Sequence, residues 1–345
     1  MNDLHWLTIK QASEAIQAGT LSPVEYTQAL ISRTEQLDPK LNAYIKFTPE
    51  RALSDAKKAE EAIVKNKSIT PMTGIPYGLK DIIDVEGFET TAHSKILIDN
   101  ISRTNAYVTN KLDSSGGILM GKLALHEFAI GGPAFDLPFP PARNPWNINH
   151  HPGGSSSGSG SAVASGMLPA ALGTDTGGSV RNPATSCGIV GMKATYGRVS
   201  KAGVIPLSFS LDHVGPITRT VEDNALLLNA IAGYDKNDPS TEQNQKIPDF
   251  TEFLQKGVKG LRIGLIRHFY TTDLKADDEM CKAVDNAAAT FKKLGAIVEE
   301  IQVSPLSHFS SCNSIILYCE ALSIHDKWFK TRPNDYSKAT RTRLM

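Results

Sequence analysis

An excess of charge of either sign is missing from this sequence. The 36 Lys and Arg residues balance the 36 Asp and Glu residues, so the formal net charge at pH 7 is zero. Proteins that bind nucleic acid or anionic membranes through electrostatic attraction usually carry a basic surplus. We therefore expect no direct nucleic-acid partner and no membrane partner.

Cysteine is also scarce, because the chain has only Cys187, Cys281, Cys312 and Cys319. None of them forms a C-x-x-C motif, and no Cys/His cluster has the spacing of zinc ligands. We therefore expect reduced thiols, no metal and no cofactor. The sequence has no apolar run long enough to cross a bilayer, and its first residues do not resemble a signal peptide. The expectation is a soluble, cytoplasmic protein.

The hydrophobic pattern alternates between helical and extended periods. A helix is predicted to begin at Ser22-Pro23, where serine can cap the helix and proline suits its first position. Other helices are predicted over about 49–65, 105–115 and 277–294, and strands over 74–85, 118–123, 261–266 and 296–301. Residues 235–246 are polar and predict an exposed loop. Alternating helices and strands predict a layered α/β fold.

Glycine and serine are concentrated in residues 153–191, which hold 10 of the 27 glycines and 8 serines. A flexible linker is one interpretation, but apolar residues such as Val163 and Leu168 interrupt the segment. A phosphate-binding loop is a second interpretation. It is disfavoured because the third glycine of G-x-G-x-x-G is missing and no Gly-Lys-Ser/Thr follows.

A serine hydrolase is the third interpretation of this segment. Two Gly-Gly-Ser turns, at 153–155 and 177–179, can each present a serine hydroxyl with little steric cover. The second turn can also direct backbone N–H groups toward an oxyanion, and losing one such donor typically costs roughly 3–4 kcal/mol of transition-state stabilisation. The G-x-S-x-G elbow of α/β-hydrolases is absent around Ser179.

Several motifs together resemble the amidase signature family. They include Gly74-Ile-Pro-Tyr-Gly-Leu-Lys-Asp81, Gly153-Gly-Ser-Ser156, Gly173-Thr-Asp-Thr-Gly-Gly-Ser-Val-Arg181, Cys187-Gly-Ile-Val-Gly-Met-Lys193 and Asp212-His-Val-Gly-Pro-Ile217. The matching segments span most of residues 74–233. The resemblance implies a mixed, mostly parallel central sheet covered by helices on both faces, with helices at the N-terminus.

The resemblance also implies roles for individual residues. Lys80 matches the family's base, Ser155 its bridging serine, which follows a cis peptide bond, and Ser179 its nucleophile. The backbone N–H groups of Thr176, Gly177, Gly178 and Ser179 match the oxyanion hole. Supporting roles fall on Ser156, Asp175 and Arg181. One departure is visible: the family usually has Gly-Gly-Ser-Ser-Gly-Gly, whereas Ser157 stands before Gly158 here.

Lysine can act as a base only when it is uncharged. With an ordinary pKa of about 10.4, roughly 1 lysine in 2,500 would be neutral at pH 7. Burial in a weakly polar site lowers the pKa of a lysine by up to several units. We therefore expect Lys80 to be buried without a paired carboxylate, with Asp81 and Asp84 directed elsewhere. A histidine base, His150 or His151, is the alternative, although two histidines in a loop are usually exposed.

Substrate contacts are less defined by the sequence. Ile130, Gly131 and Gly132 match a family segment that flanks the substrate, a small-molecule amide, whereas Phe128 is expected in the core. Residues 133–141 are rich in proline and predict a rigid surface loop.

Two other functions remain open. The chain also resembles the amidase subunit of tRNA-dependent amidotransferases, in which ammonia from glutamine passes to a partner subunit. A non-enzymatic binding protein is disfavoured, because Lys80, Ser155 and Ser179 are all present. We expect residues 1–70 to form a helical segment packed on a catalytic core over 71–345. Family members usually continue past residue 345, so this core is expected to be incomplete. A homodimer is left open.

Overall fold

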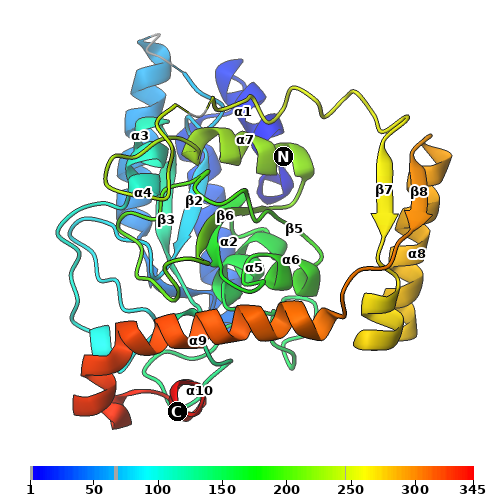
Figure 1. The fold of residues 1–345 in the computed structure, drawn as a ribbon. Helices are drawn as coiled ribbons and strands as arrows, with labels where there is room; N and C mark the ends of the chain where they lie inside the picture. Colours follow the sequence, from blue (N-terminus) through cyan, green and yellow to red (C-terminus); the bar gives the residue numbers. More distant parts are fainter. Residues whose placement is uncertain (1–2, 66–68, 245) are drawn as a thin grey trace. The chain divides into compact units, whose positions relative to one another are not determined.

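A six-stranded sheet lies at the centre of the first of two compact units of the chain. The computed structural model describes residues 3–65, 69–244 and 246–345 (Figure 1). The first unit comprises Met1–Phe250 and Tyr318–Met345, and the second comprises Thr251–Leu317. The N-terminal helices belong to the same unit as the sheet, so residue 70 does not mark a boundary between the two units. Each unit is described by itself.

The central sheet is mixed, as expected. Its strands follow the spatial order β1 (Tyr44–Phe47), β3 (Ile118–Leu123), β2 (Pro76–Lys80), β4 (Ala170–Asp175), β6 (His213–Thr218) and β5 (Val190–Gly191). The neighbours β3, β2 and β4 run parallel, whereas the pairings of β1 with β3, β4 with β6 and β5 with β6 are antiparallel. Parallel pairing is therefore confined to the middle of the sheet. The expectation of a mostly parallel sheet needs that correction, because the outer strands pair in the opposite sense.

Helices cover both faces of this sheet. The first unit contains α1 (Ile9–Gln17), α2 (Pro23–Leu41), α3 (Pro49–Val64), α4 (Tyr107–Ser114), α5 (Ser157–Ala164), α6 (Arg181–Cys187), α7 (Val221–Ile231) and α10 (Lys338–Leu344). In β2, the Tyr77 hydroxyl donates to Asp113 of α4, whereas Lys80 contacts Ser155 just before α5. Side chains three positions apart in a strand point to opposite faces. It follows that α4 and α5 lie on opposite faces of the sheet.

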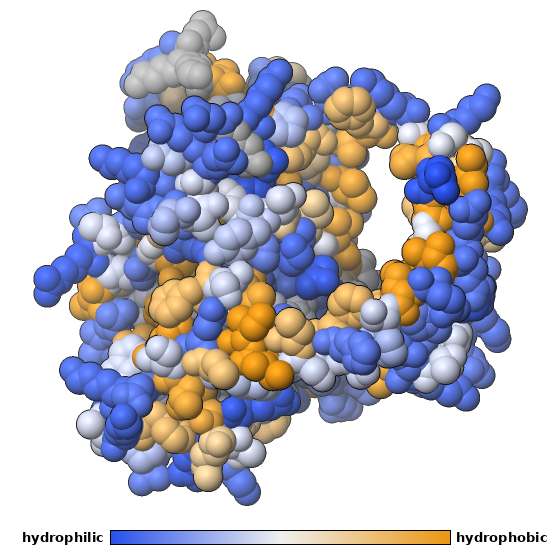
Figure 2. Space-filling model, in the orientation of Figure 1, coloured by the Kyte–Doolittle hydropathy of each residue, from blue (hydrophilic) through white to orange (hydrophobic). Residues whose placement is uncertain are grey.

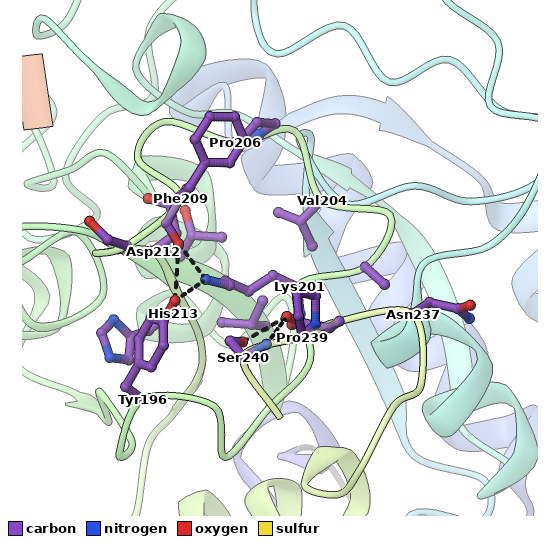
Figure 3. A pocket seen from close by; sticks show the side chains of 15 residues that line it. Tyr196, Lys201, Val204, Pro206, Phe209, Asp212, His213, Asn237, Pro239 and Ser240 are labelled. Atoms are coloured by element: carbon purple, nitrogen blue, oxygen red, sulfur yellow. Dashed lines mark hydrogen bonds between the residues drawn. The ribbon is translucent and has the colours of Figure 1, made fainter. Parts of the chain in front are cut away.

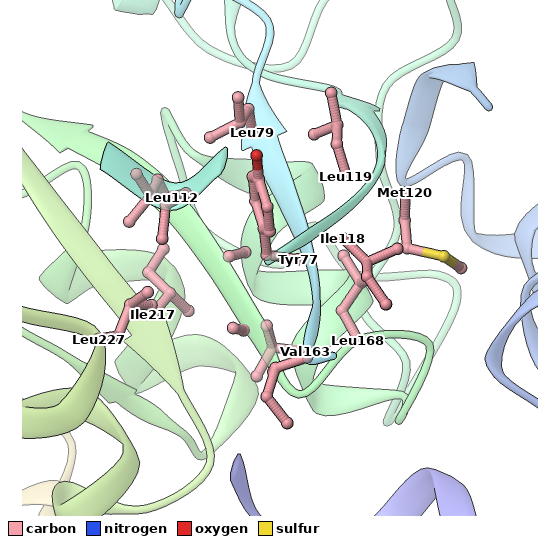
Figure 4. Packing of buried hydrophobic residues seen from close by; sticks show 14 of the residues in the cluster. Tyr77, Leu79, Leu112, Ile118, Leu119, Met120, Val163, Leu168, Ile217 and Leu227 are labelled. Atoms are coloured by element: carbon pink, nitrogen blue, oxygen red, sulfur yellow. The ribbon is translucent and has the colours of Figure 1, made fainter. Parts of the chain in front are cut away.

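The core lies between the sheet and these helices. Figure 4 shows Tyr77 and Leu79 of β2 among buried apolar side chains that come from β3, α4, α5, β6 and α7. Gly78 lies between them, and a Cβ atom there would come within 2.7 Å of both Leu123 and Leu168. This glycine therefore permits close packing on the face of β2 that also carries Lys80.

Several predicted elements are confirmed. α2 begins at Pro23, and the Ser22 side chain caps it by accepting from the N–H groups of Val24 and Glu25. The predicted strand over 118–123 is β3, and the predicted helix over 49–65 is α3. Phe128 is buried, as expected, and its ring packs edge-on against His325.

The polar segment 235–246 differs from its prediction as an exposed loop. It forms no helix or strand in the residues that are described, but Asp235 and Asp238 are buried. Asp235 accepts from the Ser200 hydroxyl, and Asp238 accepts from the Lys201 N–H. Their charges can be buried because each carboxylate has a hydrogen-bond donor. Residue 245 lies outside the described residues.

The second unit is a small β–α–β arrangement. Its parallel strands β7 (Arg262–Leu265) and β8 (Ile297–Glu300) are connected through α8 (Asp278–Lys293), close to the predicted bounds of these three elements. α8 has no buried residue. The two strands likewise contain only exposed and partly buried residues.

α9 (Leu306–Thr331) is the longest helix among the described residues. Figure 2 shows hydrophobic side chains on the surface along this helix, and Leu322 is 43% exposed. Across the described part of the chain, neither α9 nor any other helix combines the length and the hydrophobicity that a membrane span requires.

Candidate active site

Lys80 lies at the carboxyl end of β2, beside the carboxyl end of the parallel strand β4. Its Nζ atom lies 2.7 Å from Ser155 Oγ and 2.8 Å from Thr174 Oγ1, and its side chain is fully buried. Ligand sites of α/β sheets commonly form where parallel strands end. Thr174 was not among the site residues predicted from the sequence. Its position at the end of β4, one residue before Asp175, is the signal that could have identified it.

Burial is the main influence on the charge of Lys80. It lowers the pKa of this amine to about 7, and the carboxylates of Asp212 and Asp175 act in the opposite direction. Among the described residues, no carboxylate lies within ion-pair distance of Lys80. The expectation of a buried lysine without a paired acid is therefore confirmed. Near neutral pH a large share of Lys80 is uncharged.

The neighbouring acids are directed elsewhere, also as expected. Lys122 Nζ lies 2.7 Å from Asp81 Oδ1 in a fully buried ion pair. The other oxygen, Asp81 Oδ2, accepts from the N–H and hydroxyl of Thr91. Asp84 accepts from the Ser102 hydroxyl. Asp81 thus has its own counter-ion and does not neutralise Lys80.

Ser155 lies in a tight turn before α5. The Gly154–Ser155 peptide bond is cis, as the resemblance implied. The Ser155 carbonyl accepts from the His126 N–H, and a Cβ atom on Gly154 would lie 2.1 Å from the His126 ring. Ser157, the departure from the family pattern, is buried at the start of α5. The turn therefore fits together only with a glycine at position 154.

Ser179 lies in the loop after β4, which we call the nucleophile loop (residues 176–180). Its carbonyl accepts from the Ser156 N–H at 3.2 Å, which links this loop to the Ser155 turn. The Ser156 hydroxyl contacts both the carbonyl and the N–H of Thr174. The Ser179 hydroxyl makes no hydrogen bond within the described residues, and Ser179 is partly exposed. Its oxygen is therefore accessible, but its hydrogen bond to Ser155 is not formed here.

Asp175 and Arg181 stabilise the nucleophile loop through hydrogen bonds. The buried Asp175 carboxylate accepts from the Gly178 and Val180 N–H groups and from two nitrogens of the Arg181 guanidinium. Burial acts to raise the pKa of Asp175, but Arg181 and the backbone donors outweigh it, so the pKa is lowered. Asp175 thus remains charged and connects the backbone of the loop to Arg181.

The four N–H groups predicted for the oxyanion hole differ in their hydrogen bonding. The Gly178 N–H donates to Asp175 Oδ1 at 2.7 Å, so it is already used in this structure, and its role toward an oxyanion stays a prediction. The N–H groups of Gly177 and Ser179 make no hydrogen bond within the described residues. Gly177 is exposed, and Ser179 is partly exposed. These two groups can receive a developing oxyanion. Thr176 donates its hydroxyl to Asp212.

The chain also matches known proteins. The family model described as Amidase matches residues 25–345. The chain belongs to the amidase family. It is 45% identical over 315 residues to the A subunit of a glutamyl-tRNA(Gln) amidotransferase from Geobacter sp. (strain M21), and the match covers 91% of this chain. The chain spans 64% of the length of that relative.

Solved structures give the same fold. One structure was described as a vestigial protein complex that reveals the evolutionary origins of an s-triazine catabolic enzyme. It matches with a TM-score of 0.92 and 32% identity, over 98% of this chain and 73% of its own. The native peptide amidase from Stenotrophomonas maltophilia matches with a TM-score of 0.83 and 30% identity, over 96% of this chain and 69% of its own.

The rival histidine base of this amidase-family chain is not at the site. His150 and His151 are exposed, and neither contacts Ser155 or Ser179. The nearer histidine is His126, which sequence reasoning did not consider. Burial lowers the pKa of His126 to about 3, so this ring is neutral near pH 7.

A cavity of about 570 Å³ opens beside Thr174, the hydrogen-bond partner of Lys80 (Figure 3). Thr174, which contacts Lys80, forms part of its wall together with Lys201, Tyr196, Asp212 and His213. Figure 3 shows that Lys201 reaches across toward the Tyr196 hydroxyl and the Phe209 carbonyl, which lie 3.2 Å and 2.7 Å from its Nζ atom. Ser179 is not among the lining residues. The cavity thus lies next to the hydrogen-bond partner of Lys80 and not against Ser179.

The predicted substrate-flanking residues lie in two environments. Gly131 and Gly132 line a second groove, of about 720 Å³, opposite Lys338 and Thr342 of α10. Ile130 is buried and does not line it. Lys80, Ser155 and Ser179 do not line this groove either, and the role of the three residues beside a substrate stays a prediction.

Proposed function

We propose that Ser179 attacks the carbonyl carbon of an amide and that Lys80, acting through Ser155, removes the serine proton. One observation carries this proposal: the buried amine of Lys80, with a pKa of about 7, lies 2.7 Å from the Ser155 hydroxyl. The turn that carries Ser155 is hydrogen-bonded in turn to the loop that carries Ser179. An uncharged lysine is a competent base near neutral pH, whereas an ordinary lysine is not.

The steps follow from this arrangement. The Ser179 hydroxyl turns toward Ser155 and transfers its proton to Ser155 Oγ, which passes its own proton to Lys80 Nζ. The C–O bond forms, and the Gly177 and Ser179 N–H groups bind the oxyanion. The proton then returns through Ser155 to the leaving nitrogen, the C–N bond breaks, and an acyl-enzyme remains on Ser179. Water repeats the sequence and releases the acid.

We further propose that the amide is the side chain of glutamine and that the chain acts within a tRNA-dependent amidotransferase. The 45% identity to the A subunit of a glutamyl-tRNA(Gln) amidotransferase supports this assignment. Ammonia would then pass to a partner subunit, so a protein partner belongs to the proposal. The absence of direct contact with nucleic acid and the cytoplasmic location stay predictions. Whether the chain forms a homodimer stays open.

A second candidate is a stand-alone hydrolase of linear amides. The match to the peptide amidase from Stenotrophomonas maltophilia, at 30% identity, favours it. Both candidates use the same serine and the same lysine, so their substrates and partners are what distinguish them.

The chemistry is tested by mass detection of an acyl group on Ser179. We expect an adduct on the peptide that contains Ser179 after incubation with glutamine or with a panel of aryl, aliphatic and ureido amides. Ser179→Ala should abolish the adduct, and Lys80→Ala should slow its formation by about 10²–10⁴-fold, the usual effect of a general base. His150→Ala and His151→Ala are matched controls. Activity that survives Lys80→Ala but not a histidine change would overturn the assignment of the base.

A further inference from the structure

A buried carboxylate connects the nucleophile loop to a second loop, residues 206–212. Asp212 Oδ1 accepts from the Thr176 hydroxyl at 2.6 Å. Asp212 Oδ2 accepts from the N–H groups of Leu207 and Ser208, at 2.8 Å and 3.0 Å. Asp212 is only 8% exposed, so these bonds form away from bulk water. The conformation of loop 206–212 therefore determines where Asp212 holds Thr176.

Glu320 of α9 holds the same loop from the other side. Its carboxylate accepts from the Ser210 N–H at 3.1 Å, from the Ser210 hydroxyl at 2.7 Å and from the Ser208 hydroxyl. Ser208 is fully buried, and it is the shared member: its hydroxyl bonds to Glu320 and its N–H bonds to Asp212. A continuous chain of hydrogen bonds thus runs from Glu320 through Ser208 and Asp212 to Thr176, next to the proposed oxyanion donors.

We propose that Glu320 is a positioning residue that fixes the nucleophile loop through Ser208 and Asp212. This inference rests on the proposed function, because the loop that it fixes carries Ser179. Misplacing a reacting group by about 1 Å can cost on the order of 10²-fold in rate, so a distant contact that holds the loop has a kinetic effect. Phe209 and Ser210 of loop 206–212 also line the cavity beside Lys80 (Figure 3).

A merely structural role for Glu320 predicts a different result. A structural role predicts that the loss of Glu320, which is hydrogen-bonded to the buried Ser208, lowers the melting temperature. Positioning predicts that kcat falls while the thermal midpoint stays close to that of the wild type. Asp212 and Glu320 differ in their electrostatic effect on Lys80. The pKa of Lys80 is raised by the carboxylates of Asp212 and Asp175, whereas Glu320 is not among the groups that shift it.

The first experiment is hydrogen–deuterium exchange on the full 345-residue chain. It compares wild type, Glu320→Ala, Glu320→Gln and Ser208→Ala. The control is Asp326→Asn, which removes an exposed ion pair with Lys330 on the same helix. The informative amides are those of Leu207 and Ser208, which bond to Asp212, and of Gly178, which bonds to Asp175. We expect roughly tenfold faster exchange in Glu320→Ala and Ser208→Ala, a smaller change in Glu320→Gln, and none in Asp326→Asn.

The second experiment measures amide hydrolysis by the same variants across pH. We expect kcat of Glu320→Ala to fall roughly tenfold and kcat of Glu320→Gln to fall less. The acid limb, the part of the pH profile where the rate falls as the pH is lowered, should stay at the same pH in both variants. Asp212→Asn should reduce kcat as well and should move the acid limb to lower pH, because its carboxylate raises the pKa of Lys80.

The two experiments separate this inference from the proposed function. If the wild type hydrolyses no amide and forms no adduct on Ser179, the proposed function is wrong. The exchange rates still report on the hydrogen-bond chain in that case. Exchange at positions 178, 207 and 208 that is the same in Glu320→Ala as in wild type overturns the inference, whatever the activity. Wild-type kcat in Glu320→Ala also overturns it.

Discussion

Lys80 is the residue whose charge controls the proposed reaction. It must be neutral to accept the proton of Ser155, and burial lowers the pKa of its amine to about 7. Because the group is protonated below its pKa, the base is lost as the pH falls through 7 and is present above it. An unshifted lysine would instead leave the reaction rising up to a pH of about 10.4.

The expected pH profile of kcat/KM therefore has an acid limb with a midpoint near pH 7. Below it, the rate should fall about tenfold for each unit of pH, as expected for a single titrating base. Initial rates on a reactive amide between pH 5 and 10 measure this limb. His126 does not account for it, because burial lowers the pKa of that ring to about 3. A limb that persists unchanged in Lys80→Met would contradict the assignment.

At the scale of single residues, the sequence indicated which residues form the site better than it indicated which residues they contact. The motifs around Lys80, Ser155, Ser179, Asp175 and Arg181 identified the residues that the structure brings to one sheet edge. The partners of these residues were not visible in the sequence. Glu320, for example, contacts Ser208 across 112 positions of the chain, and no local pattern encodes such a pairing. The hydrogen bond from the Gly178 N–H to Asp175 was likewise not visible in the sequence.

The elements were predicted where local signals are strong. The helix from Pro23 has its capping serine, and β3 begins with an apolar run over residues 118–120. β4 and β6 were not predicted, because glycine, threonine and proline interrupt their apolar pattern. They are strands because they are buried between neighbours in the sheet, and tertiary context overrides local propensity there. The antiparallel outer strands likewise depend on long-range pairing.

The turn before α5 gives a prediction at the scale of an element. Gly154→Ala places a methyl group within 2.1 Å of the His126 ring, so the ring or the turn must move. Because the turn carries Ser155, we expect a lower melting temperature and a loss of amide hydrolysis of about 10²-fold, the cost of misplacing a reacting group. Thermal melting followed by circular dichroism and initial rates measure the two effects.

The double variant Gly154→Ala/His126→Ala is the control for this turn. Removing the ring opens the space that the new methyl group needs, so the melting temperature should return toward that of His126→Ala alone. A single Gly154→Ala variant that melts like wild type would show that the turn tolerates a side chain. Equal losses in the single and double variants would show that contact with the ring is not the cause.

The whole molecule raises the question of which amide is cleaved. The chain matches 64% of the length of the amidotransferase subunit from Geobacter sp. (strain M21), and it also matches a peptide amidase. The site near Lys80 does not discriminate between the two candidate functions, because both would use Lys80 as the base and Ser179 as the nucleophile. Substrate preference and response to a partner can discriminate, since both depend on surfaces outside the Ser179 loop.

Ammonia release from glutamine tests the two candidates directly. We expect the chain to release ammonia slowly by itself, and faster when the other amidotransferase subunits of Geobacter sp. (strain M21) and glutamyl-tRNA are added. A coupling of typical strength would give roughly a 5- to 150-fold increase. The matching protein of that organism is the positive control, and Ser179→Ala is the negative control. A stand-alone hydrolase makes the opposite prediction: peptide amides would be cleaved faster than glutamine, and the added subunits would leave the rate unchanged, because no second active site would be there to receive the ammonia.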